Sequence, residues 1–170
     1  VLGVKSGDEV LVQAYTCCVV SNAIIWTGAT PVYVDITDQF NMDADDLEKK
    51  ITSKSKVLII QHTFGIPANL SALMKIAQKY NLKVIEDCAH VMGSLYNGKM
   101  LGTYGDIGML SFGTEKPISA GRGGALITSN KTLATAIQAA QKRLPQTSPL
   151  RIWQQLLTFK LFFVSKPLYN

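Results

Sequence analysis

Short apolar runs alternate along the chain with longer segments in which apolar residues recur every three or four positions. The short runs predict β-strands over residues 9–13, 31–35, 56–61, 83–87, 107–112 and 124–128. The longer segments predict helices over residues 18–26, 42–51, 70–80, 133–142 and 150–164. This alternation predicts an α/β fold of three layers (α/β/α), in which helices cover both faces of a mostly parallel sheet.

The last part of the chain has a different pattern. Residues 1–143 predict one large domain, and residues 144–170 predict a linker followed by an amphipathic C-terminal helix. That helix is too short and too polar to span a bilayer, so we expect it to pack against other protein. Contact with a membrane surface or a partner helix is the alternative. The chain opens on Val1 in what reads as the end of an element, so we expect a piece of a longer protein.

Composition narrows the possible functions. With 47% hydrophobic and 17% charged residues among 170, the chain is typical of globular proteins. The net charge is +5, but the lysines are scattered, which argues against nucleic-acid binding and favours a mild attraction for phosphorylated or nucleotide ligands. Three cysteines, two of them adjacent, match neither a disulfide framework nor a zinc site. We therefore expect a cytoplasmic protein without a bound metal.

Polar side chains follow the ends of several predicted strands, and in a parallel sheet these ends meet at one edge. They are Tyr15, Thr16, His62, Asp87, His90, Ser111 and Lys116. Lys116 lies in a glycine-bounded loop after the strand 107–112. A lysine in such a loop is usually a solvated surface residue, but one held as a neutral amine captures carbonyl groups.

Three of these residues have both an ordinary and a chemical interpretation. Asp87 caps a loop or joins an ion pair, or else it keeps a cationic ring nitrogen protonated. His90 is structural or bonds a ring oxygen, and Ser111 is a turn hydroxyl or a phosphate donor. An aspartate, a serine and a lysine together meet the needs of pyridoxal 5'-phosphate, whose aldehyde, pyridinium and phosphate each require one such group.

Several short motifs are collinear with those of one enzyme family. They are Gly7-Asp8-Glu9-Val10, Gly28-Ala29-Thr30-Pro31-Val32, Gly65-Ile66-Pro67-Ala68, Glu86-Asp87-Cys88-Ala89-His90, Gly105-Asp106-Ile107, Glu115-Lys116 and Gly123-Gly124-Ala125. Over about residues 1–143 the sequence resembles the DegT/DnrJ/EryC1/StrS family of sugar aminotransferases, which have the fold of type I pyridoxal-phosphate enzymes.

The resemblance implies a role for each site residue. Lys116 would be the Schiff-base lysine and proton shuttle, and Asp87 would pair with the pyridine nitrogen. His90 would lie beside the ring near its phenolic oxygen, and Ser111 would hold the phosphate. Thr16 and Cys17 would also belong to the cofactor site, although the family usually has a stacking aromatic residue where this sequence has Cys17.

The resemblance also implies an activity. Such enzymes transfer an amino group, usually from glutamate, to a keto group of a nucleotide-linked sugar, and a second subunit completes their sites, so we expect a homodimer. Related sugar dehydratases carry His in place of the lysine, so Lys116 favours transamination. A non-catalytic remnant and a generic nucleotide-binding domain are the remaining alternatives. Gln13 replaces a usual Pro, and the family's first phosphate-binding turn and C-terminal small domain lie outside this sequence.

Overall fold

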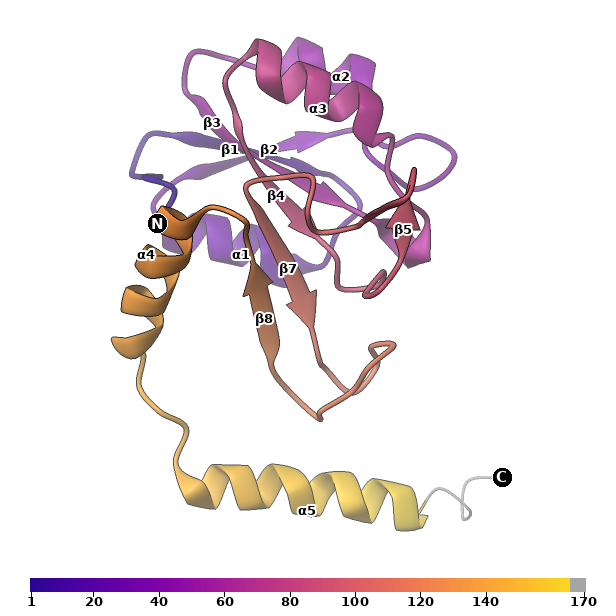
Figure 1. Cartoon of the computed structure of the whole chain (residues 1–170), viewed down its shortest axis with the longest axis vertical. Coiled ribbons are helices and arrows are strands. Elements are labelled where there is room, and N and C mark those ends of the chain that lie inside the picture. Colours follow the sequence, from indigo (N-terminus) through magenta and orange to yellow (C-terminus); the bar gives the residue numbers. More distant parts are fainter. Residues whose placement is uncertain (166–170) are drawn as a thin grey trace.

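The computed structural model describes residues 1–165, apart from the side chains of residues 159 and 162–165. Its main sheet has six strands in the order β2-β1-β3-β4-β7-β8 (Figure 1). Their bounds are β1 Glu9–Gln13, β2 Thr30–Val34, β3 Ser55–Gln61, β4 Lys83–Asp87, β7 Ile107–Ser111 and β8 Gly124–Ile127. The helices are α1 Cys18–Trp26, α2 Ala44–Lys50, α3 Leu70–Lys79, α4 Lys131–Lys142 and α5 Pro149–Ser165. The 3₁₀ turn η1 covers Thr63–Gly65.

The sheet is parallel from β2 to β7, and only β8 runs antiparallel, beside β7. The predicted α/β fold with a mostly parallel sheet is therefore confirmed. Parallel neighbours need long crossover connections, and α1, α2 and α3 lie within these connections. Because the five strands β1, β2, β3, β4 and β7 share one direction, their carboxyl ends meet along a single edge of the sheet.

Side chains that alternate along each strand build two cores. Leu11, Leu58 and Ile60 face α2 and α3. They share one buried cluster with Leu47 of α2 and Leu73 of α3. The neighbouring strand residues Val10, Val12, Val57 and Ile59 face α1, which contributes Ile24. The continuous apolar runs of the sequence thus reflect strands that are covered on both faces. In Figure 1, α1 lies on the opposite side of the sheet from α2 and α3.

Short polar side chains fix where three helices begin. Asp43 accepts hydrogen bonds from the backbone N–H groups of Asp45 and Asp46 and so caps α2. Asn69 caps α3 in the same way. Asn130 caps α4, which therefore begins at Lys131, two residues before the predicted start.

A small hairpin occupies the segment for which the sequence indicated only glycine-rich turns. It pairs β5 Leu95–Tyr96 with β6 Lys99–Met100. Asn97 and Gly98 turn the chain between the two strands, both with positive φ, at 47° and 77°. Asn-Gly is the preferred pair for a two-residue hairpin turn, so the dipeptide was the signal that would have revealed this hairpin.

The C-terminal helix α5 lies apart from the sheet in Figure 1, and its described side chains are exposed. A linker of six residues, 143–148, separates it from α4. Within residues 1–165 the structure has no helix that is both long enough and apolar enough to cross a membrane. The apolar end predicted for this helix, residues 161–164, falls largely on side chains outside the described set, and the domain division at residue 143 remains a prediction.

Candidate active site

The candidate site lies where β4 and β7 end side by side. The two strands pair in parallel, with Asp87 opposite Met109, so both chains leave the sheet at the same edge. Asp87 is the last residue of β4, and Ser111 is the last residue of β7. The loop after β7 carries Lys116, and the loop after β4 carries His90. The sheet therefore brings together four of the predicted site residues.

Lys116 and His90 are in direct contact. The Nζ atom of Lys116 lies 3.0 Å from Nε2 of His90, and both side chains are half-buried. Lysine is only a donor, so the imidazole accepts this hydrogen bond on Nε2. The loop around Lys116 is held by backbone bonds from Lys116 N–H to the Gly113 carbonyl and from Phe112 N–H to the Gly123 carbonyl. The amine is thus positioned rather than free in solvent.

Asp87 is a buried carboxylate, with 6% of its surface exposed. Within the described structure its hydrogen-bond donor is the backbone N–H of Ala89, at 3.0 Å. Burial raises the pKa of Asp87, and this donor together with the electrostatic effect of the nearby basic side chains only partly opposes the rise. A cation placed against Asp87 would relieve the cost of its burial.

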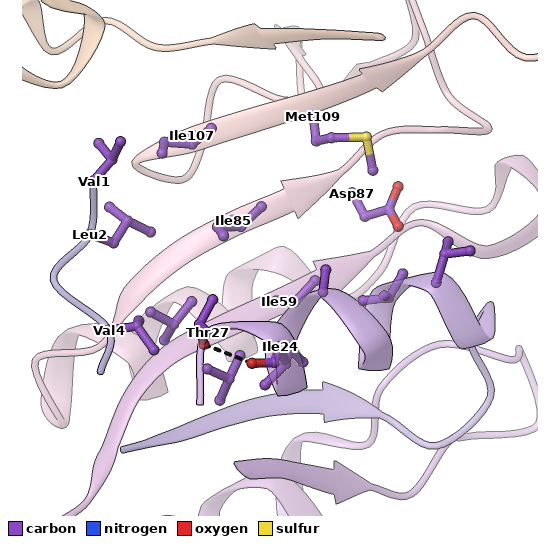
Figure 2. A pocket seen from close by; sticks show the side chains of 15 residues that line it. Val1, Leu2, Val4, Ile24, Thr27, Ile59, Ile85, Asp87, Ile107 and Met109 are labelled. Atoms are coloured by element: carbon purple, nitrogen blue, oxygen red, sulfur yellow. Dashed lines mark hydrogen bonds between the residues drawn. The ribbon is translucent and has the colours of Figure 1, made fainter. Parts of the chain in front are cut away.

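Asp87 also stands at one end of an apolar cavity of about 460 Å³ between the sheet and α1. Figure 2 shows its carboxylate beside Met109, with Ile85 and Ile59 farther along and Val1 at the other end. Nearly all of the other lining residues are apolar. The carboxylate is therefore the polar feature at this end of the cavity.

Ser111 is half-buried at the start of the lysine loop. A Cβ atom built on Gly113 would come within 3.8 Å of Ser111 Oγ and 3.7 Å of Lys116 Cγ, so both side chains flank this glycine.

Thr16 and Cys17 occupy the loop between β1 and α1. The hydroxyl of Thr16 donates to Oε1 of Gln61 at 2.6 Å, which ties this loop to the end of β3. Cys17 is exposed and occupies the N-cap position of α1 without a capping side-chain bond. The structure therefore places both residues on the predicted edge.

His62 does not belong to that exposed edge, and the expectation that it would face the site is wrong. Its side chain is fully buried, and Nδ1 accepts the backbone N–H of Ala68 at 3.1 Å. Nε2 points at Glu86, 3.5 Å from Oε2. The ring faces the core, where Ala68 of the following loop and Glu86 of β4 contact it.

Glu86 anchors the loop that follows the β5–β6 hairpin. Its carboxylate accepts the backbone N–H groups of Gly102, Tyr104 and Gly105 at 2.5–2.9 Å. Burial raises the pKa of Glu86, but these bonds and the contact with His62 outweigh that effect, so the pKa is lowered. Glu86, His62 and Cys88 form a group with metal-ligand atoms within 4.8 Å of one another.

Backbone groups already bond several ligand atoms of that group. The N–H of Ala68 bonds Nδ1 of His62, and three backbone N–H groups bond the carboxylate of Glu86, whereas Nε2 of His62 has no hydrogen-bond partner among the described residues. Burial raises the pKa of the Cys88 thiol to about 12, so the thiolate that a metal needs is disfavoured. We interpret the group as structural.

Phe64 is a site residue that the sequence analysis missed. Its ring stacks on His90, with the two planes 8° apart and the centroids separated by 6.3 Å. Its backbone has a φ of 54°, which is rare for a bulky residue. No local motif in the sequence points to this stacking, because it depends on how the loops after β3 and β4 meet.

The chain matches a known protein family over most of its length. Residues 1–159 match the DegT/DnrJ/EryC1/StrS aminotransferase family. GDP-perosamine synthase of Escherichia coli O157:H7 is 44% identical over 133 residues, which is 78% of this chain and 36% of that protein. UDP-N-acetyl-3-dehydro-alpha-D-glucosamine 3-aminotransferase of Acidithiobacillus ferrooxidans is 41% identical over 134 residues, 78% of this chain and 36% of that protein. The chain thus spans about a third of the length of these relatives.

Solved structures agree with the sequence matches. The S. venezuelae DesV structure in complex with a ketimine intermediate superposes with a TM-score of 0.80 at 32% identity, covering 87% of this chain and 40% of that one. The ntda structure from Bacillus subtilis with the cofactor PMP gives 0.72 at 38% identity, covering 78% and 30%. The chain is therefore a member of the DegT/DnrJ/EryC1/StrS aminotransferase family.

Proposed function

We propose that this chain forms the cofactor-binding part of an enzyme that transfers an amino group from glutamate to a keto group of a nucleotide-linked sugar. The observation that carries the proposal is the amine of Lys116, held 3.0 Å from His90 at the strand edge that also bears the buried Asp87. Membership of the family, and relatives named for amino sugars, support the choice of substrate.

The residues present fit pyridoxal 5'-phosphate. Asp87 is a buried carboxylate whose pKa is raised by burial, and a protonated pyridine nitrogen beside it would lower that pKa by favouring the charged carboxylate. Ser111 Oγ and Lys116 Cγ flank Gly113, so a hydroxyl for the phosphate and the chain that carries an amine for the aldehyde belong to one short loop. When bound, this cofactor supplies an aldehyde that bonds to amines and a ring that withdraws electrons.

Each side chain of the site then has a defined task. Lys116 would hold the cofactor through Nζ and would carry protons on that atom. His90 orients Nζ through its Nε2, and Asp87 would keep the ring nitrogen in its charged form. Ser111 would donate its hydroxyl to the phosphate. Thr16 and Cys17 would border the cofactor, and Cys17 would offer a smaller contact surface than an aromatic ring.

Borohydride trapping tests this proposal. The protein is mixed with pyridoxal 5'-phosphate, reduced and digested, and we expect the added mass on the peptide that contains Lys116. Lys116→Ala should lose the adduct and transamination, whereas Lys142→Ala, which removes an exposed lysine at the end of α4, should keep both. An adduct on other lysines, or none at all, would rule out the proposed role of Lys116.

The same chemistry separates transfer from dehydration. The related sugar dehydratases carry His where this chain has Lys116, so the lysine supports amino transfer. We expect glutamate to be converted to 2-oxoglutarate in the presence of a keto-sugar nucleotide. Product analysis that found a deoxygenated sugar and unchanged glutamate would contradict the assignment.

We further propose that the enzyme is cytoplasmic and works as a homodimer. The three free cysteines, two of them exposed, support a reducing compartment. The exposed edge around His90 and Lys116 supports a second subunit that covers it. Sedimentation velocity tests the dimer, and fractionation of cells tests the compartment.

A further inference from the structure

Three aromatic side chains form an exposed cluster beside the candidate active site. Tyr15, Phe40 and Phe64 are 46%, 44% and 60% exposed. Their ring centroids lie 5.6 to 5.9 Å apart, in tilted and edge-to-face arrangements. They come from the loops after β1, β2 and β3, so the cluster lies on the same sheet edge as His90 and Lys116.

The cluster is held in place rather than loosely exposed. Phe40 and Phe64 have φ values of 60° and 54°, a backbone region that bulky residues rarely adopt. Nε2 of buried Gln13 lies 2.7 Å and 3.2 Å from the carbonyls of Tyr15 and Phe40 and 2.9 Å from the hydroxyl of Thr63, and its two N–H groups are shared among these three acceptors. This one amide therefore ties together the three loops that present the rings.

A second buried amide completes the support. Asn41 accepts the backbone N–H of Thr63 at 3.0 Å and donates to the carbonyl of Ile66 at 3.0 Å, on either side of Phe64. Both Asn41 and Thr63 are almost fully buried. The molecule thus uses a buried polar network to keep hydrophobic rings in water, which points to a ligand for them.

We propose that this cluster, Tyr15, Phe40 and Phe64, binds the nucleobase of the nucleotide-linked substrate by stacking. The inference rests on the proposed function, because it takes the keto carbon to lie at Lys116. Groups follow one another outward from that amine: His90 contacts Lys116, Phe64 stacks on His90, and Tyr15 and Phe40 pack against Phe64.

A nucleotide-linked sugar has a matching order of groups. Its keto carbon is at one end, the diphosphate is in the middle, and the flat base is at the other end. With the keto carbon at Lys116, the base falls beyond His90, where the rings are. Every nucleobase has a flat π-face on which aromatic side chains stack. The amino donor, glutamate, has no aromatic ring, so the cluster suits the nucleotide rather than the donor.

Binding of nucleoside diphosphates to the cofactor-free protein tests the proposal. Calorimetry would compare GDP, UDP and dTDP with ribose 5-phosphate and pyrophosphate, which lack the base. We expect the base to strengthen binding by about 5-fold or more, the effect of one stacking contact. In saturation-transfer NMR, the base protons should receive the strongest signal.

Substitutions of the aromatic residues test whether their rings are responsible for the binding of the base. Phe64→Leu and Phe40→Leu should each weaken nucleoside diphosphate binding by about 5-fold or more, and Phe64→Tyr should keep it. Tyr33→Leu is the matched control, since Tyr33 is 45% exposed but lies within β2. Circular dichroism confirms that each variant is folded before it is compared.

Three outcomes overturn the proposal. The base-free probes bind as tightly as the nucleotides, or the two ring substitutions leave affinity unchanged, or they alter only the sedimentation of the protein. The last result would assign the rings to an interface between two copies. None of these measurements involves pyridoxal phosphate, so they stand apart from the trapping of Lys116, whose failure would instead remove the proposed transfer reaction.

Discussion

Glu86 and Asp87 are neighbours in β4, yet their side chains leave the sheet on opposite faces and their pKa values shift in opposite directions. Glu86 meets three backbone N–H groups and has a lowered pKa. Asp87 meets one and has a pKa raised by burial. One carboxylate therefore serves the fold, and the other stays under-satisfied at the edge where chemistry is proposed. The two should respond differently to pH and to substitution.

Asp87→Asn should stabilise the cofactor-free protein at pH 7. The pKa of Asp87 is higher in the folded than in the unfolded chain, where it is near 3.8, so the folded state loses stability as pH rises through that interval. The amide removes this loss. We expect the melting temperature to rise by about 2–4 °C for each kcal/mol relieved, measured by calorimetry. Below pH 3.8 the two proteins should melt alike, and a lower melting temperature of the variant at pH 7 would contradict the idea.

Glu86→Gln should destabilise the protein by roughly 3 kcal/mol at pH 7 in urea unfolding, because a neutral amide cannot accept all three backbone donors. The pKa of Glu86 is lowered in the folded state, so its contribution is complete above the unfolded value of 4.5 and is lost as pH falls through the folded value. The difference between the two proteins should therefore shrink in acid. A difference independent of pH would show that Glu86 acts through shape alone.

His90→Leu should slow the trapping of pyridoxal phosphate on Lys116 about 5-fold, because Nζ loses the hydrogen-bond acceptor that positions it. The rate of borohydride-fixed incorporation measures the effect. His90→Gln keeps an acceptor and should recover much of the rate. Equal rates in all three proteins would mean that the contact has no role in presenting the amine.

Gly108→Ala should be the most damaging small substitution in the sheet. A Cβ atom at Gly108 would lie 2.2 Å from the carbonyl oxygen of Gly102, a backbone atom that cannot move aside. We expect a loss of about 3 kcal/mol or more in urea unfolding. Gly113→Ala is the matched control, since its nearest new contact is at 3.7 Å. Similar losses of unfolding free energy in both variants would mean that the contact between Gly108 and the backbone of Gly102 has room for a side chain.

The cysteines should react in two classes. Cys17 and Cys18 are exposed, whereas Cys88 is buried with a pKa raised to about 12. A thiol reagent should therefore modify two groups quickly in the native protein and the third only after unfolding. Cys88→Ala should leave the fast phase unchanged. Rapid reaction of three groups would contradict the burial of Cys88.

The positions of the main strands and helices could be predicted from the sequence, because apolar runs and helical spacing are local signals. Lys116, Asp87, His90 and Ser111 also meet at one edge as expected, since parallel strands share their direction. The orientation of β8 could not be predicted, because a four-residue strand pairs either way. His62 failed for a similar reason: the face that a side chain takes after a strand depends on contacts far along the chain.

Most of the features that could not be predicted are contacts between separate loops. In the sequence, Gln13 stands out only because it replaces a proline that is usual in the family. In the structure its side-chain amide bonds three loops. The stacking of Phe64 on His90 is equally invisible, since 26 positions separate residues 64 and 90 in the sequence. Local sequence patterns predict strands and helices, whereas these contacts depend on how the assembled sheet places its loops.

The parallel pairing of β4 with β7 has a consequence for the order of folding. Asp87 and Lys116 lie at the ends of two strands separated by the whole β5–β6 segment, so no short-range contact brings them together. The pairing joins residues 22 positions apart, Ile85 and Ile107, so the edge exists only once the chain between them has closed into a loop. Attachment of the cofactor at Lys116 would therefore report that this loop has closed and that β4 and β7 are paired.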